Sequence, residues 1–379
     1  MRDFSRMVFF AVAALAAMAA RAAAQSVVKY GADPSGRTES TAAFQACIDA
    51  VANAGGGSVR VPPGEYRIRY LTMRPHVRLE LAGGAGIATA GWTPAVAANA
   101  MNPKLSAIIR SVEGRTDPCR IFLYNLVPPA DARKGFSDIT VSGGVFDCGG
   151  YSKLAAFACG RNIRIENVIV KDLPNDHAIQ LDGCENATVR NCIFAGYTFG
   201  GKHRALTRET IQVEQTSPGA MLARDRANSP ITCPKSVAIP NANVTVSGCW
   251  FGPSERLGPH LTALGHHASA RSCNGLAFRR NVVVEPLYCA LSLANVADAT
   301  VEGNLFISTK APSLGPGDAA IVRVWGKAAL GDGEKGVTIR RNKVTLGPDS
   351  PLRRLWISEE RRGEVTVWPG DGLREPPGR

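Results

Sequence analysis

Short runs in which apolar and polar residues alternate recur from about residue 138 onward, and each is followed by a glycine, an asparagine or an equivalent residue and then by a second apolar run. The segments are "DITVSGGVF" (138–146), "NIRIENVIV" (162–170), "NATVRNCIF" (186–194), "NVTVSGCWF" (243–251), "GLAFRRNVV" (275–283), "ATVEGNLFI" (299–307) and "GVTIRRNKV" (336–344). Alternation with a period of two places the aliphatic side chains on one face of a β-strand and the polar ones on the other. Each segment therefore predicts two short strands joined by a tight corner.

The corners recur at a nearly constant spacing. They fall at positions 143, 167, 191, 248, 280, 303 and 341, and a step of about 24 residues recurs among them. Such a step is typical of a solenoid, so we predict an all-β fold, a right-handed parallel β-helix of roughly 8–10 coils. A β-sandwich is the alternative, but it does not explain the near-constant step. Little helix is expected after residue 60.

The two ends of the chain differ from the repeats. The segment "TESTAAFQACIDAVANAGGG" starts with capping residues and ends in glycines, which predicts an amphipathic helix over about 38–54. This helix is expected to cover the open edge of the first coil, and "GSVRVPPGEYRI" (57–68) is expected to form the first strand pair. From about residue 311 the chain is rich in proline, glycine and arginine and predicts irregular end coils, within a single domain over 25–379.

The N-terminus "MRDFSRMVFFAVAALAAMAARAAAQS" has early arginines, an apolar run and small residues before Gln25. This is the layout of a secretory signal peptide, with cleavage expected near Ala24. A membrane anchor is the alternative, but the apolar run is short for a span of about 20 residues. We therefore predict a signal peptide over 1–24, a secreted or periplasmic protein and no membrane span.

The chain is basic, with a formal net charge of +12 at pH 7, or +10 without residues 1–24. This charge suits an acidic polymer as partner, but a basic balance is also common in exported proteins. No block of Lys and Arg is interleaved with aromatic residues, so a nucleic-acid partner is not expected. Export permits disulfides among the 10 cysteines. The sequence fits either a disulfide between Cys159 and Cys184 or a ladder of buried thiols.

Three distant stretches repeat one alternation: "HAIQLDG" (177–183), "ETIQVEQ" (209–215) and "HLTALGH" (260–266). Equivalent positions on successive coils stack about 4.8 Å apart. Aligning the three stretches with a fourth, "CALSLA" (289–294), gives one inward column of Ile179, Ile211, Thr262 and Leu291 and a second of Leu181, Val213, Leu264 and Leu293. His177, Glu209, His260 and Cys289 precede the first column by two positions.

The alignment gathers polar residues on one face. Gln180 stacks on Gln212, which fits either a structural amide ladder or substrate binding. Asp182 stacks on Glu214, and carboxylates so close raise each other's pKa, which favours chemistry over a solvated face. The long segments 197–208 and 216–236 flank the Glu209 strand and are expected to build a groove wall that carries Lys202 and Arg208.

Several stretches resemble a known family. "VVKYGADPSGRTESTAAFQACIDAVANAGGGSVRVPPGEY" (27–66) resembles the N-terminal signature of pectate-lyase-superfamily and polygalacturonase-like proteins. "NDHAIQLDGCENATVRNCIF" (175–194), "RETIQVEQ" (208–215) and "GPHLTALGHH" (258–267) are similar to the stretches that carry the Asn-Thr-Asp, Asp-Asp and Gly-His-Gly motifs of polygalacturonases. His177 stands where the first catalytic aspartate is expected, Arg208-Glu209 replaces the aspartate pair, and His260 keeps its type. The resemblance implies a β-helix protein active on glycans.

Three functions fit these residues. The first is a secreted glycoside hydrolase, in which two carboxylates supply the acid and the base or nucleophile. Its catalytic candidates are Asp182, Glu209, Glu214, His266 and His267, and its substrate-binding candidates are His177, Gln180, Lys202, Arg208, Gln212 and His260. No metal or other cofactor is expected for it. Retention or inversion is left open, since carboxylates one or two coils apart lie about 5 or 9.6 Å from each other.

The second function is a polysaccharide lyase that acts by β-elimination on an acidic glycan. A base such as His177, His260, Lys202 or Arg208 removes a proton beside a uronate carboxylate, with Ca²⁺ on Asp182 and Glu214 as an option. The third is a non-catalytic glycan-binding β-helix, which predicts an aromatic-lined groove. In all three the partner is a polysaccharide whose identity the sequence does not name, and the oligomeric state is left open.

Overall fold

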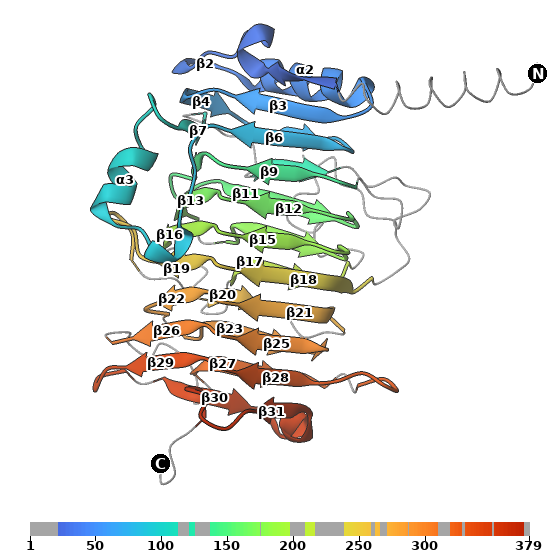
Figure 1. Ribbon diagram of the computed structural model, residues 1–379, viewed down its shortest axis with the longest axis vertical. Coiled ribbons are helices and arrows are strands. Elements are labelled where there is room, and N and C mark those ends of the chain that lie inside the picture. Colours follow the sequence, from blue (N-terminus) through green and yellow to red (C-terminus); the bar gives the residue numbers. More distant parts are fainter. Residues whose placement is uncertain are drawn as a thin grey trace, which may run out of the picture.

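The computed structural model describes residues 22–112, 121–125, 137–174, 176–197, 209–216, 239–258, 262–265, 271–286, 288–309, 319–327, 330–350 and 352–374. Over these residues the strands form three sheets of 12, 10 and 9 strands, in which every pair of neighbours in the ladder is parallel. The strands stack as successive rungs from the N-terminal to the C-terminal end of the molecule (Figure 1). The predicted parallel β-helix is confirmed.

Each coil contributes one strand to each sheet in turn. Sheet A contains β1 (Ala22–Ser26), β3 (Gly57–Val61), β6 (Val77–Leu81), β9 (Thr140–Ser142), β12 (Arg164–Glu166), β15 (Thr188–Arg190), β18 (Asn241–Ser247), β21 (Cys273–Arg279), β24 (Val296–Ala297), β25 (Ala299–Glu302), β28 (Val337–Arg340) and β31 (Val365–Val367). Sheet B contains β2 (Ser35–Glu39), β4 (Gly64–Ile68), β7 (Ala107–Ser111), β10 (Val145–Asp147), β13 (Ile169–Leu173), β16 (Ile193–Tyr197), β19 (Trp250–Gly252), β22 (Val282–Val284), β26 (Leu305–Ser308) and β29 (Lys343–Leu346). Sheet C contains β5 (Leu71–Met73), β8 (Ile121–Asn125), β11 (Lys153–Ala158), β14 (Ile179–Asp182), β17 (Glu209–Glu214), β20 (Thr262–Gly265), β23 (Leu291–Ala294), β27 (Ala320–Trp325) and β30 (Arg353–Ile357).

The corners between sheets A and B lie at the predicted repeat positions. All seven have a positive φ, between 50° and 74°: Gly143, Asn167, Asn191, Gly248, Arg280, Gly303 and Arg341. Glycine and asparagine adopt this left-handed conformation at little cost, which explains their recurrence at these positions. The backbone geometry required at each corner is therefore the physical origin of the repeat in the sequence.

In the C-terminal coils, buried asparagines stack on one another at these corners and form a ladder of hydrogen bonds. The backbone N–H of Asn281 donates to Oδ1 of Asn304 (2.9 Å), that of Asn304 to Oδ1 of Asn342 (3.0 Å), and that of Asn342 to Oδ2 of Asp371 (2.8 Å). The amide side chain of Asn304 also donates to the carbonyl of Phe278 (3.0 Å). The ladder satisfies backbone groups that the sheets leave unpaired at the corner.

The interior is filled by stacked apolar side chains. Phe194 and Phe251 lie with ring centroids 4.9 Å apart and nearly parallel planes, and Phe278 lies 6.0 Å from Phe251. The eight described cysteines are all free and buried, so of the two alternatives for Cys159 and Cys184 the structure has buried thiols and not a disulfide. Burial raises the pKa of the Cys273 thiol to about 12.

The helices and the C-terminal end differ in part from the sequence prediction. Helix α2 (Thr41–Asn53) forms as predicted and packs against the first strands at the N-terminal end (Figure 1), after the 3-10 helix η1 (Val27–Tyr30). Helix α3 (Pro94–Ala100), with η2 (Ala88–Ala90) before it, was not expected. Regular strands and η4 (Glu359–Glu364) continue to Val367, so the prediction of irregular coils from about 311 was wrong.

Residues 1–21, which carry most of the predicted signal peptide, lie outside the described residues. Among the described residues, no helix combines the length and apolar character needed to cross a membrane.

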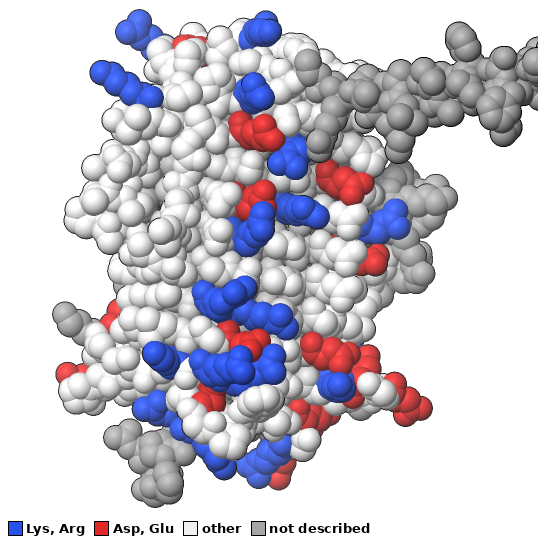
Figure 2. Space-filling model, viewed as in Figure 1, with Lys and Arg blue, Asp and Glu red and all other residues white. Residues whose placement is uncertain are grey.

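Charges of both signs mix on the face seen in Figure 2. Strands of sheet A bring Glu166 beside Arg190 (2.7 Å) and Glu302 beside Arg340 (3.0 Å). Ion pairs at the protein surface typically contribute about 0–1 kcal/mol to stability. The positive net charge is therefore not gathered into a patch of one sign on this face.

Candidate functional site

Strands β14 and β17 lie side by side in sheet C in the predicted register. The Cα partners are Ile179 with Ile211, Gln180 with Gln212, Leu181 with Val213 and Asp182 with Glu214. The four aliphatic residues belong to the core, so the alternation turns the glutamines and carboxylates to the outer face. The predicted stacking of Gln180 on Gln212 and of Asp182 on Glu214 is confirmed.

The register of the next strand differs from the prediction by two residues. Strand β20 pairs Leu264 with Ile211 and Thr262 with Glu209, whereas the sequence alignment paired Thr262 with Ile211 and His260 with Glu209. A shift of two residues keeps every side chain on the same face, so alternation alone does not distinguish the two registers. The observed register is favoured because it completes the apolar column with a leucine instead of a threonine.

His177 is buried between two carboxylates. Its Nδ1 lies 2.7 Å from the backbone oxygen of Glu209 and 3.6 Å from Oε2 of the same residue. Its Nε2 lies 3.5 Å from Oδ1 of Asp176. A carbonyl oxygen only accepts hydrogen bonds, so Nδ1 carries a proton, and in the neutral form of His177 the basic nitrogen is Nε2, which faces Asp176.

The orientation of His177 has a chemical consequence. The side chain of Asp176 is 31% exposed, whereas those of His177 and Glu209 are 4% and 2% exposed. Nε2 therefore faces the more exposed side of the cluster, where Asp176 lies, and Nδ1 faces the buried Glu209. A neutral imidazole held in one tautomer is suited to accept a proton from a bound molecule.

Lys153 completes this group, and the sequence analysis missed it. Strand β11 pairs Ala155 with Ile179, which places Lys153 level with His177 on the neighbouring coil. Its Nζ lies 3.4 Å from Oδ2 of Asp176 and donates to Oε1 of Gln180 (3.1 Å). Lys153 precedes His177 by one repeat step of 24 residues, so the spacing was a usable signal. We call Lys153, Asp176, His177 and Glu209 the acid–base cluster.

Gln180 links this cluster to the neighbouring carboxylates. Its side-chain amide donates to Oδ2 of Asp182 (3.0 Å), while its oxygen accepts from Lys153. Asp182, Gln212 and Glu214 are buried, with 1%, 7% and 7% exposure. Water is largely excluded around these groups, which strengthens the electrostatic interactions among them.

Gly265 makes room for the side chain of Glu209. A methyl group added at Gly265 would lie 2.7 Å from Cγ of Glu209 and 3.0 Å from Cβ of Ser292. The carboxylate side chain of Glu209 therefore extends over strand β20, along the outer face of sheet C. A larger residue at 265 would displace it.

The other predicted site residues lie outside the described residues. They are Lys202, Arg208, His260, His266 and His267. Within the described ranges, no group of three or more His, Cys, Asp or Glu side chains is arranged to hold a metal ion.

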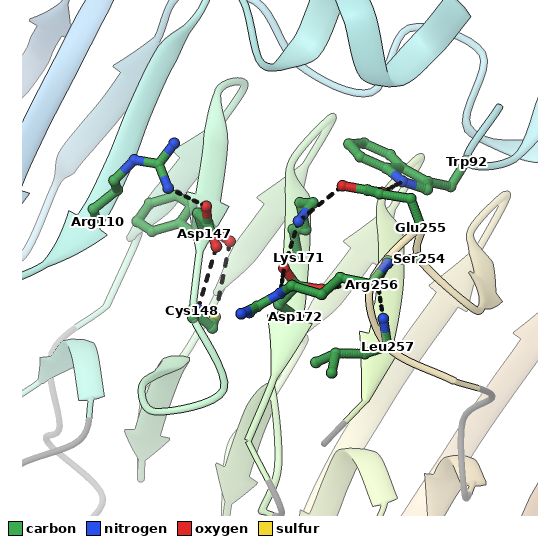
Figure 3. A network of polar contacts seen from close by, with 12 residues as sticks. Trp92, Arg110, Asp147, Cys148, Lys171, Asp172, Ser254, Glu255, Arg256 and Leu257 are labelled. Carbon is green, nitrogen blue, oxygen red and sulfur yellow. Dashed lines mark hydrogen bonds and ion pairs between the residues drawn. The ribbon is translucent and has the colours of Figure 1, made fainter. Parts of the chain in front are cut away.

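A second polar network lies on sheet B (Figure 3). Asp172 accepts from Ser254 Oγ (2.8 Å) and Arg256 Nε (2.9 Å) and pairs with Lys171. Lys171 also pairs with Glu255 (3.0 Å), which accepts from Trp92 Nε1 (2.5 Å). The network fastens the loop after β19 and the segment before α3 to the sheet, so we assign it a structural role.

The pKa values in this network follow from its contacts. Burial on its own would lower the pKa of Lys171, but hydrogen bonds to Asp172 and Glu255 and the charges of Asp172 and Asp147 outweigh burial and raise it. Partial burial would raise the pKa of Glu255, but hydrogen bonds from Trp92, its own backbone N–H and Lys171 outweigh burial and lower it.

No protein-family model matches the chain. Among curated proteins, it is 27% identical over 311 residues to "Plasmin and fibronectin-binding protein A" of Streptococcus pneumoniae, covering 75% of this chain and 39% of the relative. It is 37% identical over 91 residues to "Alginate lyase 7" and 28% identical over 200 residues to "Mannuronan C5-epimerase AlgE6", both of Azotobacter vinelandii. These matches cover 24% and 46% of this chain but 11% and 21% of the relatives.

Solved structures share the fold. The Streptococcus pneumoniae surface protein and adhesin PfbA superposes with a TM-score of 0.64 at 21% identity, over 91% of this chain and 88% of that one. The catalytic unit of a GH87 α-1,3-glucanase from Streptomyces thermodiastaticus superposes with a TM-score of 0.53 at 16% identity, over 91% of this chain and 58% of that one. Together with the three stacked parallel sheets, these likenesses identify the chain as a parallel β-helix protein.

Proposed function

We propose that this protein is an enzyme that acts on an acidic polysaccharide by removing the proton next to a sugar carboxylate, in a lyase-type β-elimination. The observation that carries the proposal is the orientation of His177. Its Nδ1 donates to the backbone oxygen of Glu209, so the neutral form of His177 carries its basic nitrogen at Nε2, beside the partly exposed Asp176. Lys153 supplies a positive charge in the same cluster.

The chemistry requires both groups. A proton on the carbon next to a carboxylate becomes acidic enough to remove when a cation neutralises that carboxylate, which is the role we assign to Lys153. His177 Nε2 takes the proton, and the electron pair forms a carbon–carbon double bond while the bond from the adjacent carbon to the glycosidic oxygen breaks. The leaving oxygen takes a proton from water. Each cleavage gives one reducing end and one unsaturated end.

Two of the curated relatives support this reaction class. Their names specify an alginate lyase and a mannuronan C5-epimerase. Both alginate and mannuronan are polymers of uronic acids, and both reactions begin with removal of the proton beside the uronate carboxylate. The net positive charge, +10 without residues 1–24, favours encounter with such a polyanion. We also propose that residues 1–24 direct export of the protein.

Glycoside hydrolysis is the second candidate, and the pairing of Asp182 with Glu214 favours it. Neighbouring strands lie about 4.8 Å apart, close to the separation of roughly 5–5.5 Å between the carboxylates of retaining glycosidases. Glu209, whose side chain reaches over Gly265 on the same face, is the third carboxylate of this set. In this reaction a carboxylic acid protonates the glycosidic oxygen and water is added.

A panel of purified polymers distinguishes the candidates. The full chain is incubated with alginate, polygalacturonate and a neutral glucan, and reducing ends and ultraviolet absorbance are measured together. We expect new reducing ends with an equal amount of unsaturated product from an acidic polymer. Reducing ends without absorbance would support hydrolysis. Binding without any cleavage would support the non-catalytic, glycan-binding alternative.

A further inference from the structure

A cluster of aromatic rings around an arginine lies on the same sheet as the acid–base cluster, nearer the C-terminal end. The guanidinium carbon of Arg323 lies 4.8 Å from the ring centroid of Tyr288, 5.4 Å from that of Trp325 and 5.3 Å from that of Trp356. We call these four residues the aromatic platform. We propose that it is a remote subsite that binds a uronate unit of the same acidic polymer, and this inference rests on the proposed function.

The register of sheet C connects the platform to the site. On the outer face, one column runs from Gln212 to Gly265, Ser292, Arg323 and Trp356 on successive strands. Strands β17 and β27 are three steps apart in the order β17-β20-β23-β27, which corresponds to about 14 Å. A polymer that follows the axis of the solenoid past His177 therefore reaches the platform within a few sugar units.

The residues between the two sites are small. Gly265 has no side chain, and Ser292 and Ala294 are the outward residues of β23. Only short side chains therefore separate Gln212 from the tryptophans along this column. The side chain of Glu209 lies over Gly265.

The platform is held rigidly and is partly open. Trp325 Nε1 donates to Oγ of Ser292 (2.9 Å), which fixes the indole ring against the neighbouring strand. Trp325 and Trp356 are half-buried, whereas Arg323 is 6% exposed. Solvent therefore meets the tryptophan rings first, with a buried positive charge close to them.

This combination suits an acidic sugar. The C–H face of a pyranose ring is apolar and packs on an indole ring, and the arginine charge, kept in a poorly hydrated setting, attracts the sugar carboxylate. A structural role alone would be met by rings that are fully buried, as in the Phe194–Phe251 stack inside the solenoid. A structural role alone does not explain why two tryptophans on a polar face are partly exposed.

The test measures binding separately from cleavage. Affinity electrophoresis in gels that contain alginate, polygalacturonate or their carboxyl-reduced forms is run with the inactive His177→Gln chain. We expect Trp356→Ala to weaken retention by the acidic polymers about tenfold. Trp368→Ala is the matched control, because Trp368 is exposed and stacks on Arg340 (5.2 Å) on sheet A. It should leave retention unchanged.

A second variant, Arg323→Met, tests the platform even if Trp356→Ala does not fold. Arg323→Met keeps an unbranched side chain, and we expect it to remove the preference for acidic over carboxyl-reduced polymer. Circular dichroism and melting curves confirm that each variant folds. In the active chain, Trp356→Ala should raise KM for long oligouronates but not for disaccharides, with kcat unchanged.

The outcomes separate the two proposals. Retention that depends on Trp356 and Arg323 without cleavage by the wild-type chain would reject the proposed function and leave the platform as a glycan-binding surface. Cleavage with unchanged retention and KM in folded Trp356→Ala and Arg323→Met variants would overturn the platform and leave the proposed function. No retention of the wild-type chain by either acidic polymer would also overturn the platform.

Discussion

Replacing Gly265 with alanine should impair catalysis more than it impairs folding. The added methyl group would lie 2.7 Å from Cγ of Glu209, whereas carbon atoms in contact prefer about 3.5–4.0 Å. Glu209 must therefore move by about 1 Å relative to His177, or the strands must separate. Misplacement by about 1 Å is enough to cost roughly 100-fold in rate, and overpacking costs about 1–3 kcal/mol of stability.

The control is Gly258→Ala, because no atom lies within 4 Å of a methyl group added there. Both variants are compared with wild type by thermal unfolding and by kcat on the acidic polymer that gives the highest activity. We expect Gly265→Ala to lose most of its kcat with a modest fall in Tm, and Gly258→Ala to match wild type. A Gly265→Ala chain with wild-type kcat would refute the role that we give to the position of Glu209.

Three other substitutions test separate parts of the structure. Lys153→Met should lower kcat on acidic polymers by 100-fold or more, roughly the loss seen when one transition-state donor is removed, with Tm kept within a few degrees; an unchanged kcat would exclude Lys153 from the reaction. Glu255→Gln should lower Tm at pH 7 by a small amount, because the lowered pKa of Glu255 means that its contribution is present above the unfolded value of about 4.3 and is lost as the pH falls through the folded value. The difference from wild type should therefore vanish in acid, and a difference that grows in acid would contradict this sign. Asn304→Leu should cost about 1–3 kcal/mol for each buried partner that it leaves without a hydrogen bond, the backbone N–H of Asn281 first among them; chemical denaturation measures this, and a loss below 1 kcal/mol would show that the ladder is not needed.

The fold was largely predictable from the sequence because the backbone conformation of each corner restricts which residue types can occupy it. Positions such as Asn167 and Gly248 adopt a left-handed conformation that few residues tolerate, so glycine or asparagine occupies five of the seven corners. Helix α3 was not predicted because it is a single short element outside the repeat. Its local signal was Thr93 followed by Pro94, and the hydroxyl of Thr93 does accept from the N–H of Val96 (3.3 Å).

The candidate site was predictable only in part. The pairing of Asp182 with Glu214 followed from alternation, because the two stretches match residue for residue. The next strand carried two acceptable registers, since a shift of two residues preserves both faces, and the choice depends on packing that the sequence does not display. The sheet B network was missed for another reason. Asp172 meets Ser254 and Arg256, which follow it by 82 and 84 residues and lie beside β19, two strands away in sheet B, with no motif that links them.

The most direct test of the account is a competition between two forms of the same oligouronate, one with hydrogen and one with deuterium on the carbon next to the carboxylate. Because the two compete for the same enzyme, the isotope ratio in the product reports on kcat/KM. If His177 removes this proton in a rate-determining step, the product is enriched in the form that carried hydrogen, and His177→Gln abolishes product formation. Cleavage of both forms at equal rates, or full activity of His177→Gln, would contradict the central claim.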